Sequence, residues 1–262
     1  MPQLSVHPNA DIDFDVRFCD DDLLVVDKPA GVVTQPGKGH ARDSLLNGLF
    51  ARYGVRLQNL GADRDWGLLH RLDRDTSGLV LVGLRPRAYD ALREAFATGR
   101  IRKTYWAVVL GSPRTAQGTV QQAIAEVIGG QKRAVISRSG RPAVTAYRVL
   151  ATAAVESRPG KPAAGRVSLI EARPATGRLH QVRVHMAHLG CPILGDEMYG
   201  RDMAMPAVPR LCLHAAELRF VHPTTQKRMT VTSPCPPDLR RVLAKFALPE
   251  PRSAEASGAE EA

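Results

Sequence analysis

Cysteine is scarce in this chain of 262 residues, and the few cysteines are scattered. No two of them form a Cys-x-x-Cys pair, which argues against a zinc ribbon and leaves no framework for disulfides. We therefore expect reduced thiols, as in a cytoplasmic protein. The four positions are Cys19, Cys191, Cys212 and Cys235.

Long apolar runs are also missing. The segment from Met1 to Asp15 is polar and acidic and has no apolar core of the kind that a secretory signal needs. No stretch approaches the length of a membrane span. The run Gly37-Lys38-Gly39-His40 is too short for a phosphate-binding loop and lacks its Lys-Ser/Thr ending. The sequence therefore predicts a soluble, cytoplasmic protein with no membrane segment, and we find no internal repeat.

Basic residues outnumber acidic ones. The chain has 36 Lys and Arg against 26 Asp and Glu, a formal net charge of +10. Such an excess favours polyanionic partners, nucleic acid first, although a generic solubility charge is the alternative. The length suits one large domain or two small ones and is ample for a sizeable core.

The chain divides by composition into an arm, a body and a tail. Residues 1–13 indicate a loose arm, residues 14–248 one large domain, and residues 249–262 a disordered tail of mostly Ala, Ser, Glu and Pro. Periodicity and turn residues predict the elements within the body. The predicted strands are 23–26, 79–82, 101–110, 119–128, 133–137, 143–151, 166–172 and 227–232, with a short extended piece at 32–37. The predicted helices are 44–53, 87–98 and 237–246, with a loop at 56–66, a turn at 129–130 and a mobile hairpin tip at 156–165.

A dense polar turn leads into the apolar strand 79–82. Between His70 and Asp75, five of six residues are ionisable. Carboxylates held beside cations at the edge of a core mark a possible functional site. A solvated turn with surface ion pairs is the alternative, and chemistry alone favours it.

The order of the residues in this turn is more informative than its charge. His70-Arg71-Leu72-Asp73-x-x-Thr76-Ser77-Gly78 resembles the signature of the RluA-type RNA pseudouridine synthases. The resemblance implies that Asp73 is the catalytic residue, that Arg71 enters the RNA stack when the target base leaves it, and that His70 lies at the RNA. Upstream, Lys28-Pro29-x-Gly31 resembles the first motif of that family, so Lys28 would line the cleft or contact phosphate; a turn lysine in water is equally open.

A third run opens the strand 101–110. Lys103-x-Tyr105 resembles the second motif of the family, which implies that the Tyr105 ring stacks on the flipped base and that Lys103 contacts RNA. A tyrosine that merely packs on a strand face is the alternative. Four arginines in the following strands would either face RNA or form a solvated face. These are Arg133, Arg138, Arg141 and Arg148.

The run from Thr176 to His188 resembles the Thr-Gly-Arg-x-His-Gln-x-Arg-x-His motif of the same family. A helix wheel places Arg183 on the flank of an apolar stripe, where a guanidinium needs an anionic partner or a snorkelling stem. The resemblance implies that Arg183 pairs with Asp73, and that Arg178 and His180 contact RNA. The spacing of His180, His185 and His188 differs from the zinc pattern His-Glu-x-x-His, so we expect no metal. The sequels Gly195-Asp196-x-x-Tyr199-Gly200 and 211–223 also resemble family motifs.

Taken together, the resemblance covers most of the chain and implies an α+β pseudouridine synthase fold. We expect a mixed, mostly antiparallel sheet with flanking helices and a central RNA-binding cleft. The catalytic domain is expected to make up nearly the whole chain. The implied reaction isomerises uridines of ribosomal or transfer RNA by base flipping, with no cofactor, in a monomer. Two alternatives remain: a catalytically silent RNA-binding or RNA-folding module, and a metal-dependent nuclease that uses Asp73, Asp75 and the histidines.

Overall fold

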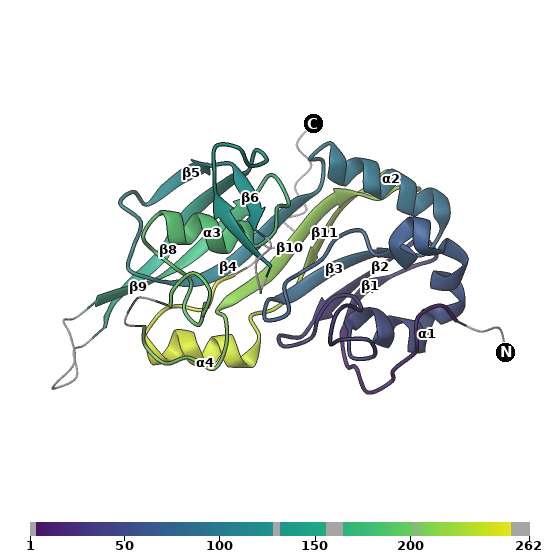
Figure 1. Cartoon of the computed structure of the whole chain (residues 1–262), viewed down its shortest axis with the longest axis horizontal. Helices are drawn as coiled ribbons and strands as arrows, with labels where there is room; N and C mark the ends of the chain where they lie inside the picture. The colour runs from purple at the N-terminus through teal and green to yellow at the C-terminus, as the bar shows by residue number, and fades with distance from the viewer. Residues whose placement is uncertain (1–3, 128–131, 156–164, 202, 204, 253–262) are drawn as a thin grey trace. The chain divides into compact units, whose positions relative to one another are not determined.

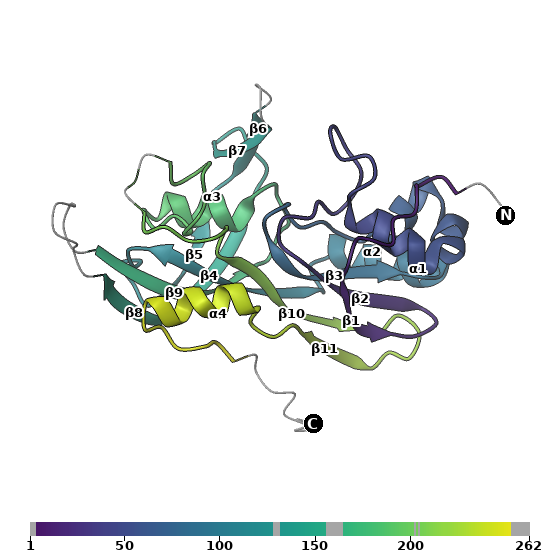
Figure 2. The ribbon, with the colours of Figure 1, turned by 90° about the horizontal axis from the view of Figure 1, so that it is seen from below.

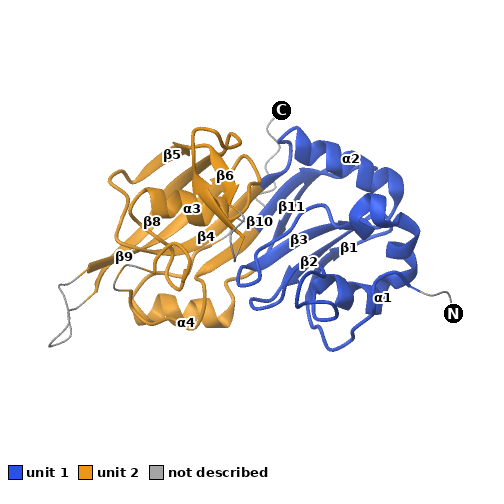
Figure 3. Cartoon of the chain, viewed as in Figure 1, with its two compact units in different colours: residues 1–102, 217–233 blue, residues 103–216, 234–262 orange. Residues whose placement is uncertain are grey.

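The computed structural model describes residues 4–127, 132–155, 165–201, 203 and 205–252. These residues form two compact units (Figure 3). Unit 1 is residues 1–102 and 217–233, and unit 2 is residues 103–216 and 234–262. None of the helices among the described residues is long and apolar enough to cross a membrane.

The described residues of unit 1 form sheet strands, two α-helices and a 3₁₀ segment, and the pairs β1–β2, β2–β3 and β10–β11 are antiparallel (Figure 1). Its strands lie in the order β1-β2-β3-β10, and β11 pairs with β10. Strand β10 belongs to this unit through its second half. The elements are β1 (Asp15–Cys19), β2 (Leu23–Lys28), α1 (Leu45–Leu60), η1 (Ala62–Gly67), β3 (Ser77–Gly83), α2 (Pro86–Ala97), β10 (Leu213–Val221) and β11 (Arg228–Thr232).

The two central strands of unit 1 are buried because both are nearly continuous apolar runs. Leu23 of β2 and Leu81 of β3 join a cluster that also contains Leu92 of α2 and Phe220 of β10. The predicted strands at 23–26 and 79–82 and the helix at 87–98 are therefore confirmed. Strand β1 was not predicted, because none of its five residues is buried and they carry no apolar run.

Helix α1 begins where its cap predicts and ends later than predicted. Ser44 is the N-cap, and its hydroxyl accepts a hydrogen bond from the Asn47 N–H at 3.3 Å. The predicted loop at 56–66 is wrong, since the helix runs to Leu60 and is followed by η1. Leu57 and Leu60 extend the buried face by one turn, and Gly61, with φ 73°, ends the helix.

Unit 2 contains a row of sheet strands, α-helices and a separate two-stranded ribbon, and the pairs β4–β9, β9–β8, β8–β5 and β6–β7 are antiparallel. The first half of β10 and the strands β4, β9, β8 and β5 follow one another in the sheet, and β6 pairs only with β7 among the described strands. The elements are β4 (Arg102–Leu110), β5 (Gln117–Gln121), β6 (Ile124–Val127), β7 (Arg133–Ile136), β8 (Val144–Val155), β9 (Gly165–Pro174), α3 (Gln181–His188) and α4 (Pro237–Lys245).

The predicted strand 119–128 is two strands. Its first part, β5, pairs with β8, whereas its second part, β6, turns away and pairs with β7. The β6–β7 ribbon packs on α3 through Ile124, Ala134 and Val184 (Figure 2). The strands from β5 to β8 therefore do not pair simply in the order of the sequence. The predicted turn at 129–130, most of the hairpin tip at 156–165 and the tail beyond residue 252 lie outside the described residues.

Candidate active site

The loop that carries Asp73 is held on both sides of that residue. Before it, the Thr34 hydroxyl donates to the Leu72 carbonyl at 2.8 Å and accepts from the Leu72 N–H at 3.0 Å. After it, the Arg74 carbonyl accepts from the Gly31 N–H at 2.9 Å and from the Lys28 ammonium at 3.0 Å. The segment 28–34 therefore fixes the backbone around a half-buried carboxylate.

Lys28 is a structural residue of this loop. It is 0% exposed, and its ammonium also donates to the carbonyls of Pro29 and Val32 at 2.7 and 2.6 Å. A buried ammonium is tolerated only when its donors are used in this way. The prediction that Lys28 contacts RNA phosphate is wrong for this conformation, and so is the alternative of a lysine in water.

The other residues of the loop differ in how they are held. The His70 ring accepts from the Leu81 N–H through Nε2 at 3.0 Å, which anchors it to β3. Arg71 is exposed and has no ion-pair partner in the described part of the chain, as a side chain that enters an RNA stack requires. Asp75 pairs with its neighbour Arg74 at 3.0 Å on the surface. Of the two carboxylates, Asp73 is therefore the better candidate for catalysis.

The two hydrogen bonds between the Thr34 hydroxyl and the Leu72 backbone, here called the Thr34 brace, lead to a first prediction. Replacing Thr34 by Val keeps the shape but strands the Leu72 N–H and carbonyl, which should cost about 1–3 kcal/mol of unfolding free energy. Turnover should fall as well, because the backbone next to Asp73 is released. Urea unfolding and single-turnover rates would measure both effects. Thr34→Ser retains the hydroxyl and serves as control; a fully active Thr34→Val would mean that the brace does not position Asp73.

In unit 2, Lys103 and Tyr105 begin strand β4. Residues two apart on a strand point to the same face, so both side chains share a face. Tyr105 is buried against the sheet, where it pairs with Ala172 of β9. The Lys103 ammonium donates to the Thr176 carbonyl at 3.4 Å, and burial together with the nearby Arg178 lowers its pKa to about 8.

Helix α3 presents Arg183 to a carboxylate of its own unit. Its guanidinium forms a two-pronged pair with Asp196, at 2.8 and 2.9 Å, and its Cζ lies 5.2 Å from the centre of the Tyr199 ring. The Asp196 side chain is 1% exposed and also accepts from the N–H groups of Met198 and Tyr199. Asp196 thus orients Arg183, a role that the sequence motif alone did not reveal.

The predicted partner of Arg183 was Asp73. The two residues belong to different units, and their pairing stays a prediction. The pair with Asp196 supplies the anionic partner that the helix wheel required, since the Arg183 side chain is only 11% exposed. A planar guanidinium has donors for more than one carboxylate, so the pair with Asp196 does not compete with the predicted one.

Two of the three histidines in this run, His180 and His185, contact separate partners. His180 has the left-handed φ of 50° at the start of α3, and its Nδ1 lies 2.9 Å from the Tyr199 hydroxyl. The buried His185 contacts Thr145 through Nδ1 and the Gln122 carbonyl through Nε2, at 2.8 and 3.1 Å. His188 is exposed at the end of the helix. These contacts give His180 and His185 structural partners, and the RNA contact of His180 stays a prediction.

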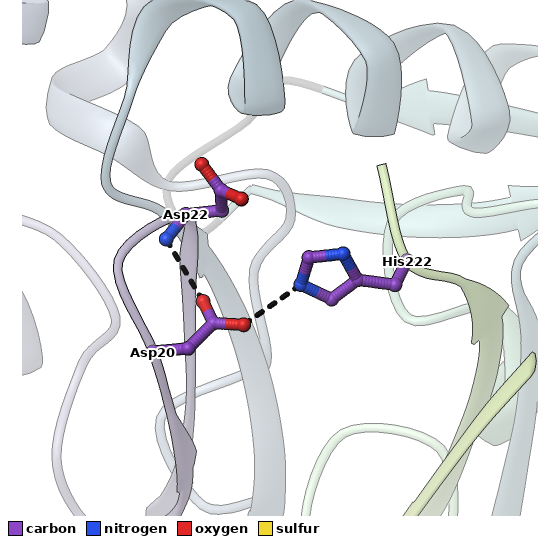
Figure 4. A group of neighbouring side chains, drawn as sticks. All are labelled: Asp20, Asp22 and His222. Carbon is purple, nitrogen blue, oxygen red and sulfur yellow. Dashed lines mark hydrogen bonds and ion pairs between the residues drawn. The ribbon is translucent and has the colours of Figure 1, made fainter. Parts of the chain in front are cut away.

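Another acidic group with a histidine lies in unit 1 and consists of Asp20, Asp22 and His222 (Figure 4). The His222 Nδ1 accepts from the N–H groups of Thr224 and Thr225, so the proton lies on Nε2, which donates to Asp20 at 2.8 Å. Both ring nitrogens are therefore engaged, and neither offers a lone pair to a metal. We interpret the group as a tie between the β1–β2 turn and the end of β10.

Comparisons with known proteins agree with the motifs. Residues 22–188 match the family model described as RNA pseudouridylate synthase. The chain belongs to this family. The family membership and the isomerase class that the motifs implied are thereby confirmed.

Curated relatives cover most of the chain. An uncharacterized RNA pseudouridine synthase of Chloroflexus aurantiacus is 40% identical over 219 residues, which are 84% of this chain and 65% of the relative. The ribosomal large subunit pseudouridine synthase D of Zymomonas mobilis is 37% identical over 92% of this chain and 75% of its own length. The protein of that name from Xanthomonas campestris is 35% identical over 94% and 73%. The chain thus spans from slightly under two thirds to three quarters of these relatives.

Solved structures confirm the α+β fold. The human RNA pseudouridylate synthase domain containing 1 protein matches with a TM-score of 0.66 and 26% identity, over 94% of this chain and all of that chain. The domain containing 4 protein matches with the same TM-score and 24% identity, over 90% and 94%. The predicted mixed, mostly antiparallel sheet with helices is therefore confirmed.

Proposed function

We propose that this protein isomerises uridine to pseudouridine in large-subunit ribosomal RNA. The single observation that carries the proposal is the braced loop at Asp73 in a chain of the pseudouridylate synthase family. The choice of RNA follows the two relatives named for the ribosomal large subunit. Transfer RNA, which the motifs left open, is the second candidate substrate.

The reaction defines what the side chains have to do. The bond between N1 and C1′ breaks, the uracil turns, and C5 joins C1′; C5 loses a proton and N1 gains one. No electrons are exchanged with a cofactor. Since the base is inaccessible in a stacked helix, it must leave the stack. We assign Asp73 as the nucleophile or base, Tyr105 as the stacking platform, Arg71 as the side chain that fills the gap, and Arg183 as the cation that keeps Asp73 ionised.

Pseudouridine mapping tests this function in cells. Ribosomal and transfer RNA from a deletion strain would be compared, site by site, with RNA from the parent and from a strain complemented with the intact gene. We expect at least one pseudouridine of the large-subunit RNA to disappear and to return on complementation. Loss confined to transfer RNA would replace the proposed substrate, and unchanged maps would overturn the proposed activity.

Tyr105 provides the next prediction. Tyr105→Ala should weaken RNA binding by the stacking energy of a base, ~1–3 kcal/mol, and slow turnover. Tyr105→Phe keeps the aromatic face and should bind RNA normally, though it could turn over more slowly if the hydroxyl takes part in proton transfer. Equilibrium binding and single-turnover rates would be measured on both variants after their folding is checked by thermal unfolding, because the ring is also buried. Full activity of Tyr105→Ala would reduce the residue to a packing role.

A further inference from the structure

The turn before α3 is built to stay rigid. The Gln181 side-chain carbonyl accepts from the Thr176 hydroxyl at 2.7 Å and from the Arg178 N–H at 3.0 Å. Its amide donates to the Val144 carbonyl and the Thr145 hydroxyl of β8, both at 2.9 Å. Gln181 is buried, so these bonds form away from water, where an unmade one would be costly. The backbone of Arg178 is therefore fixed relative to β8.

This rigid turn collects three cations of unit 2. The Arg178 Nε donates to the Pro142 carbonyl at 3.1 Å, which brings its guanidinium beside the exposed Arg141. The Lys103 ammonium reaches the same turn at the Thr176 carbonyl. Burial and, to a lesser extent, the nearby Arg141 lower the pKa of Arg178, and burial and Arg178 lower the pKa of Lys103 in the same way, so the cations lie close enough to repel one another.

Among the described residues, no carboxylate pairs with the two guanidiniums of this group. Neither Arg141 nor Arg178 forms an ion pair within the described ranges, whereas Arg173, on the neighbouring strand β9, pairs with Glu171 at 2.8 Å. Holding like charges together by a rigid turn costs electrostatic free energy, and binding of an external anion would offset this repulsion. The arrangement is therefore complementary to an anion.

Access to the group is open at Gly177. This residue is exposed, and a Cβ built on it would lie 3.6 Å from the Lys103 ammonium. A side chain at this position would contact the lysine. The glycine thus leaves the space next to the ammonium unfilled.

We propose that Lys103, Arg141 and Arg178 form a subsite for a backbone phosphate of the substrate RNA. The identity of the ligand as RNA rests on the proposed function, whereas the anion subsite rests on the geometry of the turn. The planar guanidiniums would grip two phosphate oxygens, and the ammonium would supply a point charge. The subsite would set the register of the RNA strand next to Tyr105 without reading its sequence.

The salt dependence of RNA binding tests the subsite. The probe is a short, fluorescein-labelled single-stranded RNA of mixed sequence, titrated with the full chain at several salt concentrations. Arg141→Gln and Arg178→Gln are each expected to weaken binding by roughly tenfold, and their double variant to lower the slope of log affinity against log salt by about one. Arg173→Gln, which removes an exposed arginine that already has a carboxylate partner, is the matched control and should leave both quantities unchanged.

The possible outcomes separate the two proposals. Weaker binding with an unchanged slope would show that the arginines contact a base or ribose, and equal effects in Arg173→Gln would show a diffuse basic surface; either result overturns the subsite. Pseudouridine formation in a large-subunit RNA transcript is measured on the wild-type chain in parallel. If the wild-type chain forms no pseudouridine but the salt slopes behave as expected, the proposed function fails and the phosphate subsite stands.

Discussion

Replacing Asp73 by Asn should abolish pseudouridine formation while RNA affinity stays within a few fold of the wild type. The amide keeps the size of the side chain and one acceptor oxygen but is neither a nucleophile nor a base. A rate loss of at least on the order of 10³-fold is expected for the removal of such a group. Single-turnover rates and equilibrium binding to the same ribosomal RNA transcript would separate chemistry from binding.

Asp75→Asn is the matched control for this experiment. Asp75 lies two residues away, and its carboxylate is occupied by the surface pair with Arg74, so its loss should be mild. Equal losses in both variants would mean that the catalytic role has been given to the wrong carboxylate. A fully active Asp73→Asn would remove the basis of the proposed mechanism.

The second large effect is expected at Arg183. Arg183→Met should cut turnover heavily and move the acid limb of the rate–pH profile upward, because a carboxylate that loses its cation holds its proton to higher pH. The unfolding free energy should also fall, by about 3–5 kcal/mol, since the buried Asp196 loses its partner. Rate–pH profiles and urea unfolding would measure the two effects separately.

Two further variants isolate the role of Arg183. Arg183→Lys keeps the charge without the planar two-donor geometry and should restore part of the rate. Asp196→Asn removes the carboxylate that orients Arg183 but leaves the cation in place, so it should slow turnover without moving the acid limb. An acid limb that stays in place in Arg183→Met, with near-normal turnover, would show that Arg183 is not the partner of Asp73 and would make Arg178 the next candidate.

The sequence predicts best where a single physical signal dominates. Strands β2, β3 and β4 are apolar runs bounded by turn residues, and α2 has a clear buried stripe closed by Gly99. Strand β1 was missed because none of its residues is buried and it carries no apolar run, and the last turn of α1 was missed because the burial of Leu57 and Leu60 depends on neighbours that are distant in the chain. The break between β5 and β6 was missed because two short strands with different partners look like one in sequence.

The site residues show a similar division. Family motifs singled out Asp73, Tyr105 and Arg183, whose functions are still predictions. The hydrogen bonds that hold the site residues in place were not predicted, because their partners are distant in sequence. Thr34 and Leu72 are 38 positions apart, and Asp196 and Arg183 are 13 positions apart. Lys28 was misjudged because no local pattern distinguishes a lysine in water from one whose ammonium is enclosed by carbonyls. Asp196 could have been suspected, since an acid directly after the run Pro192-Ile193-Leu194-Gly195 is carried towards the core and needs a partner there.

The most direct measurement uses RNA labelled with tritium at C5 of uridine. Joining C5 to C1′ releases the C5 hydrogen to water, so each pseudouridine should free one tritium. The wild-type chain is expected to release tritium from an unmodified large-subunit RNA transcript, with no metal or cofactor added, in step with the pseudouridine detected in the product. Asp73→Asn should release none. Absence of both tritium release and pseudouridine with a folded, RNA-binding wild-type chain would contradict the proposed activity.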